Sequence, residues 1–154
     1  MPKTSHQRIV QYLSTILAAF VTARGLGTVL FSPLRVRLGP GRFREPDVVF
    51  MSAAHSDRIG EDYWQGADLV IEVLSTHAKD RRRDLVTKRR EYAQAGISEY
   101  WIVDPQQKRI TVLKRRGKSY LTHAEAGPGE LVTSSLFKGL KVSTDDVLAV
   151  AKVK

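Results

Sequence analysis

Two acidic residues occupy positions where they could bind a metal ion. Asp47 stands at the head of the short apolar run 48–51, and Glu72 interrupts the apolar run 69–74. An acidic side chain inside such a run is costly unless a cation or a hydrogen-bond donor compensates its charge. Two converging carboxylates would suit Mg²⁺ or Mn²⁺, because these ions prefer oxygen ligands and keep part of their water. An ion held in this way could polarise a phosphodiester and lower the pKa of a bound water.

A lysine that follows the second acid could serve the same chemistry. Lys88 lies in the segment 79–95, which has helical character, and its ammonium group could stabilise an attacking hydroxide or the charge of a phosphate. Asp84, Lys88 and Tyr92 recur every four residues and therefore share one face of that helix. In a purely structural interpretation, the acids cap a strand or pair with an arginine, and the lysine pairs with an acid on its own helix. The spacing alone leaves both interpretations open.

The segments that carry these groups predict a unit of strand, helix and strand. The apolar runs 69–74 and 100–103 are short and rich in β-branched or aromatic residues, as is typical of strands buried on both faces of a sheet. Between them, the helical segment 79–95 ends at Gly96 and turns Leu85, Val86 and Ala93 toward the sheet. Two strands joined through a helix are parallel and connected in the right-handed sense. We expect the two acids to meet where adjacent strands of this sheet lie side by side.

An amphipathic helix is predicted near the N-terminus. Residues 5–24 carry apolar side chains at three- and four-residue spacing, and Thr4 with Gln7 has the form of a capping box. His6 falls in the first turn of this helix. A solvated or packed histidine is the usual outcome there, and a role in a site is the alternative.

The remaining segments predict strands, turns and one surface loop. The loop 52–66 contains Tyr63 and Trp64, which we expect to pack on the core in preference to stacking on a base. The segment 28–38 predicts a strand pair or a bent strand, broken at Ser32-Pro33, and 47–51 predicts an inner strand. The other predicted elements are a hairpin of 108–114 and 118–125 with a basic tip, and a short strand and brief helix over 136–150 with a cap at Ser143 or Thr144.

The composition is that of a folded protein. With 154 residues, 42% hydrophobic and 27% charged, the chain is expected to form a single domain over residues 1–154. It contains no cysteine, which excludes disulfides and thiolate metal sites and favours a reducing cytoplasm. No apolar stretch reaches the roughly 18 residues of a membrane span, and the N-terminus has no signal-peptide pattern. We therefore expect a cytoplasmic protein without a membrane span.

The net charge of +9 favours a polyanionic partner, with nucleic acid ahead of an anionic membrane surface. The positive charge gathers in the predicted helix 79–95 and at the tip of the predicted hairpin. The candidate nucleic-acid-binding residues are Arg81, Arg82, Arg83, Arg89, Arg90, Arg115 and Arg116. The alternative is a solvated helix face, because runs of like charge often have no partner.

Four motifs together resemble the Uma-type family of endonucleases, within the PD-(D/E)XK restriction-endonuclease-like superfamily. They are Pro46-Asp47, Glu72-Val73-Leu74-Ser75, Asp84-x-x-x-Lys88-x-x-x-Tyr92 and Gly96-x-x-Glu99-Tyr100-Trp101-x-x-Asp104-Pro105. The resemblance covers nearly the whole chain, and the joint pattern is specific although no single motif is. It implies an α/β, restriction-endonuclease-like fold with an αβββαβ core, a mixed central sheet flanked by helices, and a C-terminal β-hairpin.

The resemblance also implies a function and a site. Asp47 and Glu72 would be the metal-binding carboxylates for Mg²⁺ or Mn²⁺, and the main-chain carbonyl of Val73 would be a third ligand. The superfamily's lysine usually lies two residues after the acid, at the position of Leu74, and Lys88 on the following helix matches its place in this family. Asp84 and Tyr92 would support the site. The implied activity is metal-dependent hydrolysis of DNA phosphodiester bonds.

Two alternatives to an active nuclease stay open. Members of the family commonly carry a further N-terminal segment with an acidic residue, whereas this sequence has no acid before Glu45. This departure favours a catalytically inactive nucleic-acid-binding module of the same fold as the second hypothesis. A structural or regulatory subunit with vestigial acids is the third, and the presence of Asp47, Glu72 and Lys88 together argues against it. A homodimer is plausible, because cutting two antiparallel strands suits two-fold symmetry.

Overall fold

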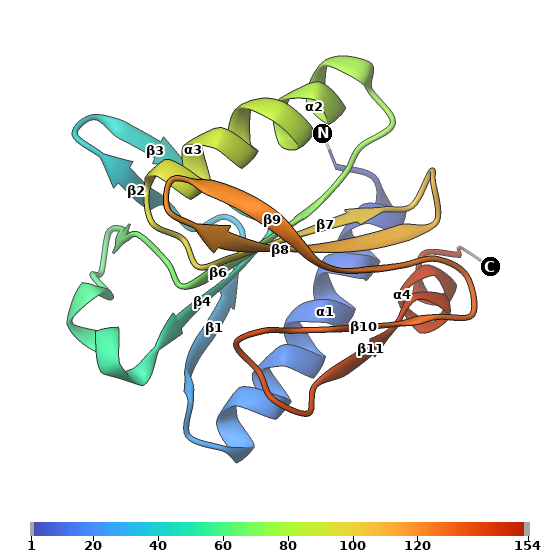
Figure 1. Cartoon of the computed structure of the whole chain (residues 1–154), viewed down its shortest axis with the longest axis horizontal. Helices are drawn as coiled ribbons and strands as arrows, with labels where there is room; N and C mark the ends of the chain where they lie inside the picture. The colour runs from blue at the N-terminus through green and yellow to red at the C-terminus, as the bar shows by residue number, and fades with distance from the viewer. Residues whose placement is uncertain (1, 153–154) are drawn as a thin grey trace.

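The apolar run around Glu72 forms strand β6 (Leu69–Val73) at the centre of a six-stranded mixed sheet (Figure 1). The computed structural model describes residues 2–152. The sheet has the order β1-β4-β6-β7-β8-β9, with β1 at Gly27–Phe31, β4 at Val48–Ser52, β7 at Glu99–Asp104, β8 at Arg109–Arg116 and β9 at Ser119–Ala126. β6 and β7 are parallel, and the other neighbouring strands are antiparallel. The predicted mixed sheet and its parallel pair are confirmed, and the predicted hairpin forms β8 and β9 at one edge of this sheet.

Helices cover both faces of this sheet. α1 (Thr4–Ala23) and the short α4 (Thr144–Val150) lie on one face, and the helical segment between β6 and β7 lies on the other (Figure 1). That segment consists of α2 (Ala78–Arg82), a π turn (Arg83–Thr87) and α3 (Lys88–Gln94). The predicted αβββαβ core is confirmed. Along the chain it consists of α1, then β1, β4 and β6 of the main sheet, then the helical segment α2–α3, and then β7.

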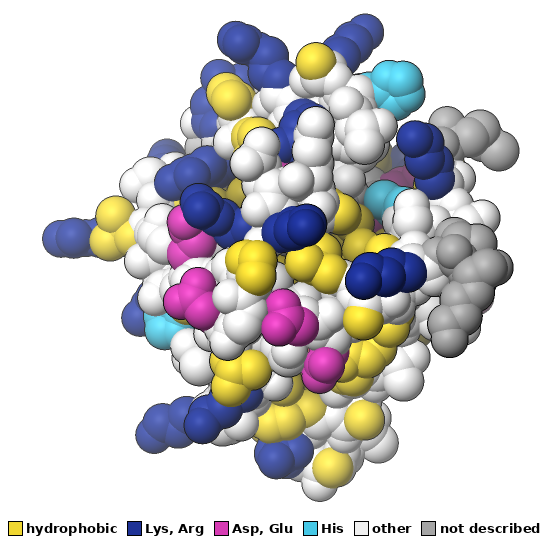
Figure 2. All heavy atoms as spheres, turned by 90° about the vertical axis from the view of Figure 1, so that its right-hand side faces the viewer, with side chains coloured by type: hydrophobic (Ala, Val, Ile, Leu, Met, Phe, Trp, Pro, Cys, Tyr) yellow, Lys and Arg dark blue, Asp and Glu magenta, His cyan; other side chains and the backbone are white. Residues whose placement is uncertain are grey.

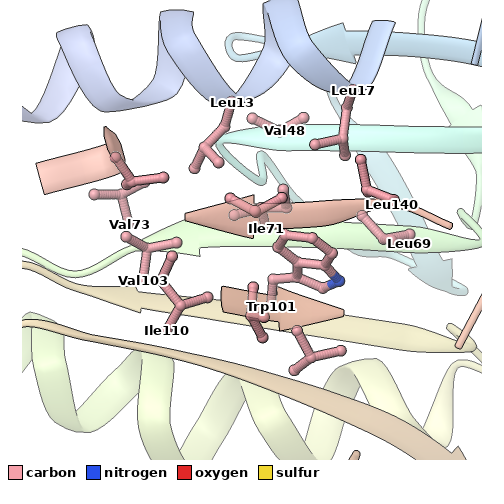
Figure 3. Packing of buried hydrophobic residues seen from close by; sticks show 14 of the residues in the cluster. Leu13, Leu17, Val48, Leu69, Ile71, Val73, Trp101, Val103, Ile110 and Leu140 are labelled. Carbon is pink, nitrogen blue, oxygen red and sulfur yellow. The ribbon is translucent and has the colours of Figure 1, made fainter. Parts of the chain in front are cut away.

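The alternation of side chains along the strands builds one core on each face. Leu13 and Leu17 of α1 pack on Val48 of β4 and Ile71 of β6, and Trp101 of β7 fills the centre of this cluster (Figure 3). Each of these side chains is fully buried. Because strand side chains alternate between faces, residue 72 projects to the opposite face from residues 71 and 73, under α3. Glu72 is thereby placed below the helix that carries the lysine.

The second core lies between the sheet and α3. Tyr92 of α3 packs edge-to-face on Tyr100 of β7, with the ring centroids 5.1 Å apart. Trp64 belongs to the same cluster and is 1% exposed, in agreement with its predicted packing role. Tyr63 packs edge-on against Phe43, 5.4 Å between centroids.

The sequence does not predict four elements of the structure: β3, β5, a 3₁₀ helix and β10. The second half of the predicted strand pair over 28–38 is β2 (Val36–Gly39), which forms a hairpin with β3 (Arg42–Arg44) and pairs in parallel with β5 (Trp64–Gln65). The loop 52–66 also contains a short 3₁₀ helix, Ala53–Arg58. Near the C-terminus, β10 (Leu131–Thr133) pairs with β11 (Lys141–Ser143). The predicted cap at Ser143 is confirmed, because its hydroxyl accepts a hydrogen bond from the Asp146 amide.

Two local expectations are wrong. The N-cap of α1 is Lys3, without a side-chain capping bond, and the Gln7 side chain contacts His6 instead of closing a capping box. Leu85 and Val86 are 39% and 51% exposed and do not face the sheet. The π turn is wider than an α-helical turn, and it changes which residues of this segment point inward. Within residues 2–152, no helix is both long and apolar enough to cross a membrane.

A buried carboxylate fastens β7 to the segment before β11. Glu99 is fully buried and accepts hydrogen bonds from the Trp101 indole, from the Ser134 hydroxyl, and from the amide and hydroxyl of Ser135, all between 2.6 and 2.9 Å. These bonds give the Glu99 of the sequence motif a structural role.

Replacing Glu99 by Gln is expected to lower the free energy of unfolding by about 2 kcal/mol, because the amide turns donors toward groups that already donate. Urea unfolding would measure the change, with the exposed Glu61→Gln as control. A Glu99→Gln protein as stable as the control would contradict this role.

Candidate active site

The two acids singled out in the sequence meet at one end of β4 and β6. Asp47 immediately precedes β4, and the register of the antiparallel pair aligns Val48 with Ile71. The Asp47 amide donates a hydrogen bond to Glu72 Oε1 at 3.1 Å, and the Val73 amide donates to Asp47 Oδ2 at 2.7 Å. Main-chain donors of each strand therefore orient the carboxylate of the other.

Lys88 lies above Glu72 and joins it to a third acid. The Lys88 ammonium donates to Glu72 Oε2 and lies 2.8 Å from Asp84 Oδ1. The Tyr92 hydroxyl donates to Glu72 Oε2 at 3.3 Å. Asp84 and Lys88 belong to the π turn and the residue after it, and π turns of this kind are frequent at functional sites. The shared face of Asp84, Lys88 and Tyr92 is thus present and is turned toward Glu72.

The cluster carries more negative than positive charge. Glu72 is 2% exposed, and burial raises its pKa to about 7, against the lowering effect of Lys88 and with the charges of Asp47 and Asp84 adding to the rise. Burial lowers the pKa of Lys88, but the charges of Glu72 and Asp84 outweigh it and raise that pKa above its usual value. The lysine is therefore held as an ammonium. The raised pKa of Glu72 means that its negative charge is disfavoured among the neighbouring acids, and a cation bound beside them would relieve this.

His6 joins this cluster from the first turn of α1. Its Nε2 lies 3.1 Å from the Val73 carbonyl oxygen and 3.3 Å from Asp47 Oδ2, and its Nδ1 lies 3.1 Å from Gln7 Oε1. Burial lowers the pKa of His6, but the hydrogen bond and charge of Asp47 exceed this effect and raise it. The sequence placed His6 in a first turn without showing its partners, because Val73 lies 67 positions away along the chain.

The chemistry of the donor set fits a hard divalent ion. Asp47 and Glu72 supply carboxylate oxygens and Val73 supplies a main-chain carbonyl, all at one end of the two strands. No residue among 2–152 donates a hydrogen bond to Asp47 Oδ1. No group of three His, Asp or Glu side chains in that part of the chain is already arranged around a metal position, so this set depends on the main-chain carbonyl.

The structure divides the candidate nucleic-acid-binding arginines into two groups. Three of them are already paired within the protein. Arg81 forms a bidentate salt bridge with Asp104 at 2.9 and 2.8 Å, Arg83 pairs with Asp80 at 2.5 Å, and Arg89 donates a hydrogen bond to the Tyr120 carbonyl at 3.4 Å. The others are exposed: Arg82 and Arg90 on the helices, and Arg115 and Arg116 at the hairpin tip. In Figure 2, Lys and Arg side chains gather along the upper edge of the molecule, the edge that carries α2 in Figure 1. The exposed pair on the helices has its charges available to a polyanion.

A basic pocket opens beside the lysine. Its volume is about 400 Å³, and it is lined by Arg35, Phe43, Arg44, Glu45, Arg83 and Lys88. Phe43 and Arg44 of β3 and Arg83 and Lys88 of the helical segment all line it, and Arg44 forms a bidentate salt bridge with Glu91 at 2.6 and 3.1 Å. The sequence showed a basic strand at 35–37 but not that the turn after it would bring Arg44 next to the predicted site.

The αβββαβ core, with two acids and a lysine gathered at one end of adjacent strands, defines a protein of the restriction-endonuclease-like class. A crystal structure from Anabaena variabilis ATCC 29413, described as a "putative nuclease belonging to DUF820", shares this fold with a TM-score of 0.79. It is 18% identical and aligns over 99% of this chain and 84% of its own. The family model Uma2, described as "Putative restriction endonuclease", matches residues 1–151, and the chain belongs to this family. No curated protein sequence matches it.

Proposed function

We propose that this chain is a metal-dependent endonuclease that hydrolyses DNA phosphodiester bonds. The observation that carries the proposal is the buried contact of Lys88 with Glu72 beside Asp47, where Lys88 also lines a basic pocket. A lysine held between carboxylates in this way is suited to a reaction in which negative charge develops on a phosphate.

Each group has a defined task in the proposed reaction. Asp47, Glu72 and the Val73 carbonyl would hold Mg²⁺ or Mn²⁺, which supplies a Lewis acid and a bound water of lowered pKa. Lys88 meets the scissile phosphate as a point charge, and Asp84 keeps its ammonium in place. The guanidinium group of Arg35, which lines the pocket over the Phe43 ring, would receive a neighbouring phosphate.

An assay on supercoiled plasmid tests this activity directly. The purified protein is expected to convert the plasmid to nicked or linear forms with Mg²⁺ or Mn²⁺ and to leave it intact with EDTA. Asp47→Asn protein, purified in parallel, would reveal a contaminating nuclease. Intact plasmid with both ions, together with salt-dependent binding, would favour the inactive nucleic-acid-binding module instead.

DNA binding itself is expected to depend mainly on exposed charge. Replacing Arg82 and Arg90 by Ala should make the slope of log affinity against log salt shallower by about 1.8 on duplex DNA, since each phosphate contact contributes about 0.9. Sequence preference should not change, because phosphate contacts carry no base information. Fluorescence anisotropy over a salt series would measure both.

The matched control removes two exposed lysines elsewhere, Lys138 and Lys141, which lie with β11 on the other side of the sheet from α2 (Figure 1). An equal change of slope in this control would mean that only net charge matters. We also propose that the protein acts in the cytoplasm, consistent with its lack of cysteine, and as a homodimer when it cuts both strands.

A further inference from the structure

His6 occupies a place that neither the sequence motifs nor the proposed reaction assigns. Its ring nitrogen Nε2 faces two oxygens of the proposed ligand set, the Val73 carbonyl and Asp47 Oδ2. The side chain is 16% exposed and is held by α1, one of the longest elements of the fold. This ring is therefore fixed at the site by the packing of a whole helix.

The spacing of these atoms matches that of ligands around one ion. Nε2 lies 3.1 Å from the carbonyl and 3.3 Å from the carboxylate oxygen. Adjacent ligands of an octahedral ion with bonds of about 2.1 Å are about 3 Å apart. Both separations from Nε2 are close to those of adjacent ligands on one ion.

The other ring nitrogen is oriented as in a ligating histidine. Nδ1 lies 3.1 Å from Gln7 Oε1, an acceptor for the Nδ1 proton. Nε2 faces two acceptor oxygens and therefore carries a proton, which a bound metal ion would displace. Metal-binding histidines usually donate the second N–H to a carbonyl or carboxylate, which holds the remaining proton on that nitrogen. Gln7, which does not cap the helix, thus has a role in positioning the ring.

We propose that His6 is a nitrogen ligand of the metal ion at this site, together with Asp47, Glu72 and the Val73 carbonyl. The inference rests on the proposed function, since it concerns the same ion. Imidazole nitrogen suits transition metals, whereas Mg²⁺ and Ca²⁺ prefer oxygen alone. The site is therefore selective for Mn²⁺ or Co²⁺ over Mg²⁺ and Ca²⁺.

Calorimetric titration of His6→Ala with Mn²⁺, Co²⁺ and Mg²⁺ tests the selectivity. We expect the affinities for Mn²⁺ and Co²⁺ to fall about tenfold or more, since even outer partners of metal ligands contribute 10–100-fold. The affinity for Mg²⁺ should change much less. His123→Ala, which removes an exposed histidine of β9, is the control and should bind all three ions as the parent does.

A second measurement begins with the parent protein, so its first result does not depend on a variant. Pulsed EPR of Mn²⁺ bound to protein with ¹⁵N-labelled histidine should show one directly bound imidazole nitrogen, and His6→Gln should lose that signal. Two results would contradict the role of His6: a His6→Ala protein that binds Mn²⁺ as tightly as the parent, or a parent protein without nitrogen coupling. If Asp47→Asn still abolishes metal binding, such a result leaves the proposed metal site intact. A parent that binds none of the ions would overturn the proposed function as well.

Discussion

Replacing Asp47 by Asn is expected to abolish metal binding and to lower metal-dependent cleavage by roughly 10³-fold or more, and Glu72→Gln should do the same. A metal ion contributes several kcal/mol of charge stabilisation in the transition state, and each 1.36 kcal/mol corresponds to a tenfold change in rate. Asn at position 47 keeps the size of the acid, and its amide oxygen can still accept the Val73 hydrogen bond, so the loss in Asp47→Asn should come from the missing charge rather than from a changed fold. Gln at position 72 would turn amide hydrogens toward a group that donates to Glu72, so the stability of that variant is measured as well.

Calorimetric titration with Mn²⁺ and single-turnover cleavage would measure the two effects on the same preparations. Asp62→Asn is the matched control, because Asp62 is an exposed acid in the loop before β5. We expect this control to bind metal and to cut DNA like the parent. Undiminished Mn²⁺ binding in both site variants would rule out the two-carboxylate metal site.

Replacing Lys88 by Ala is expected to lower the single-turnover rate by roughly 10²-fold or more, the usual effect of losing one electrostatic catalytic group. Metal and DNA binding should be largely retained. The structure makes this prediction sharper than the sequence could, because the ammonium contacts Glu72 as well as Asp84 of its own helix. An ordinary exposed helix pair would contribute only about 0.3–0.5 kcal/mol, and no activity would depend on it.

A lower cleavage rate in Lys88→Ala must be distinguished from a loss of stability. Without Lys88, the buried Glu72 loses its cation and its pKa should rise further, because Lys88 lowers it in the parent. Urea unfolding at the assay pH would show that the variant is folded, and Lys79→Ala, at an exposed position of α2, is the control. A folded Lys88→Ala protein that cuts at the parental rate would contradict the catalytic role of the lysine and leave the metal site standing.

The fold could be predicted because its signals are local and repeated. The apolar runs that became β6 and β7, the periodic side chains of α1 and the Gly96 stop each follow from a few adjacent residues. The order of these elements then restricts the topology to a parallel pair with a helix across it. The meeting of Asp47 and Glu72 follows from the same pattern, because it needs only that β4 and β6 be neighbours.

The features that escaped prediction depend on contacts between distant residues or on one irregular turn. His6 reaches the site only when α1 packs across the sheet, and nothing near it in the sequence shows this. The π turn has no clear local signal, yet it exposes Leu85 and Val86. The run of charge around Arg81 predicts a contact with nucleic acid, whereas in the fold Arg81 forms a bidentate salt bridge with Asp104, which lies 23 positions away.

The most direct test of the proposed active site is a crystal of the protein soaked in Mn²⁺ and measured at a wavelength where manganese scatters anomalously. We predict a single strong peak in contact with Asp47, Glu72 and the Val73 carbonyl, with His6 Nε2 at bonding distance. The Asp47→Asn crystal should show no such peak. Two results would contradict the proposed metal site. One is anomalous density for manganese only at other carboxylates, and the other is no manganese density in a crystal in which solvent reaches Asp47 and Glu72.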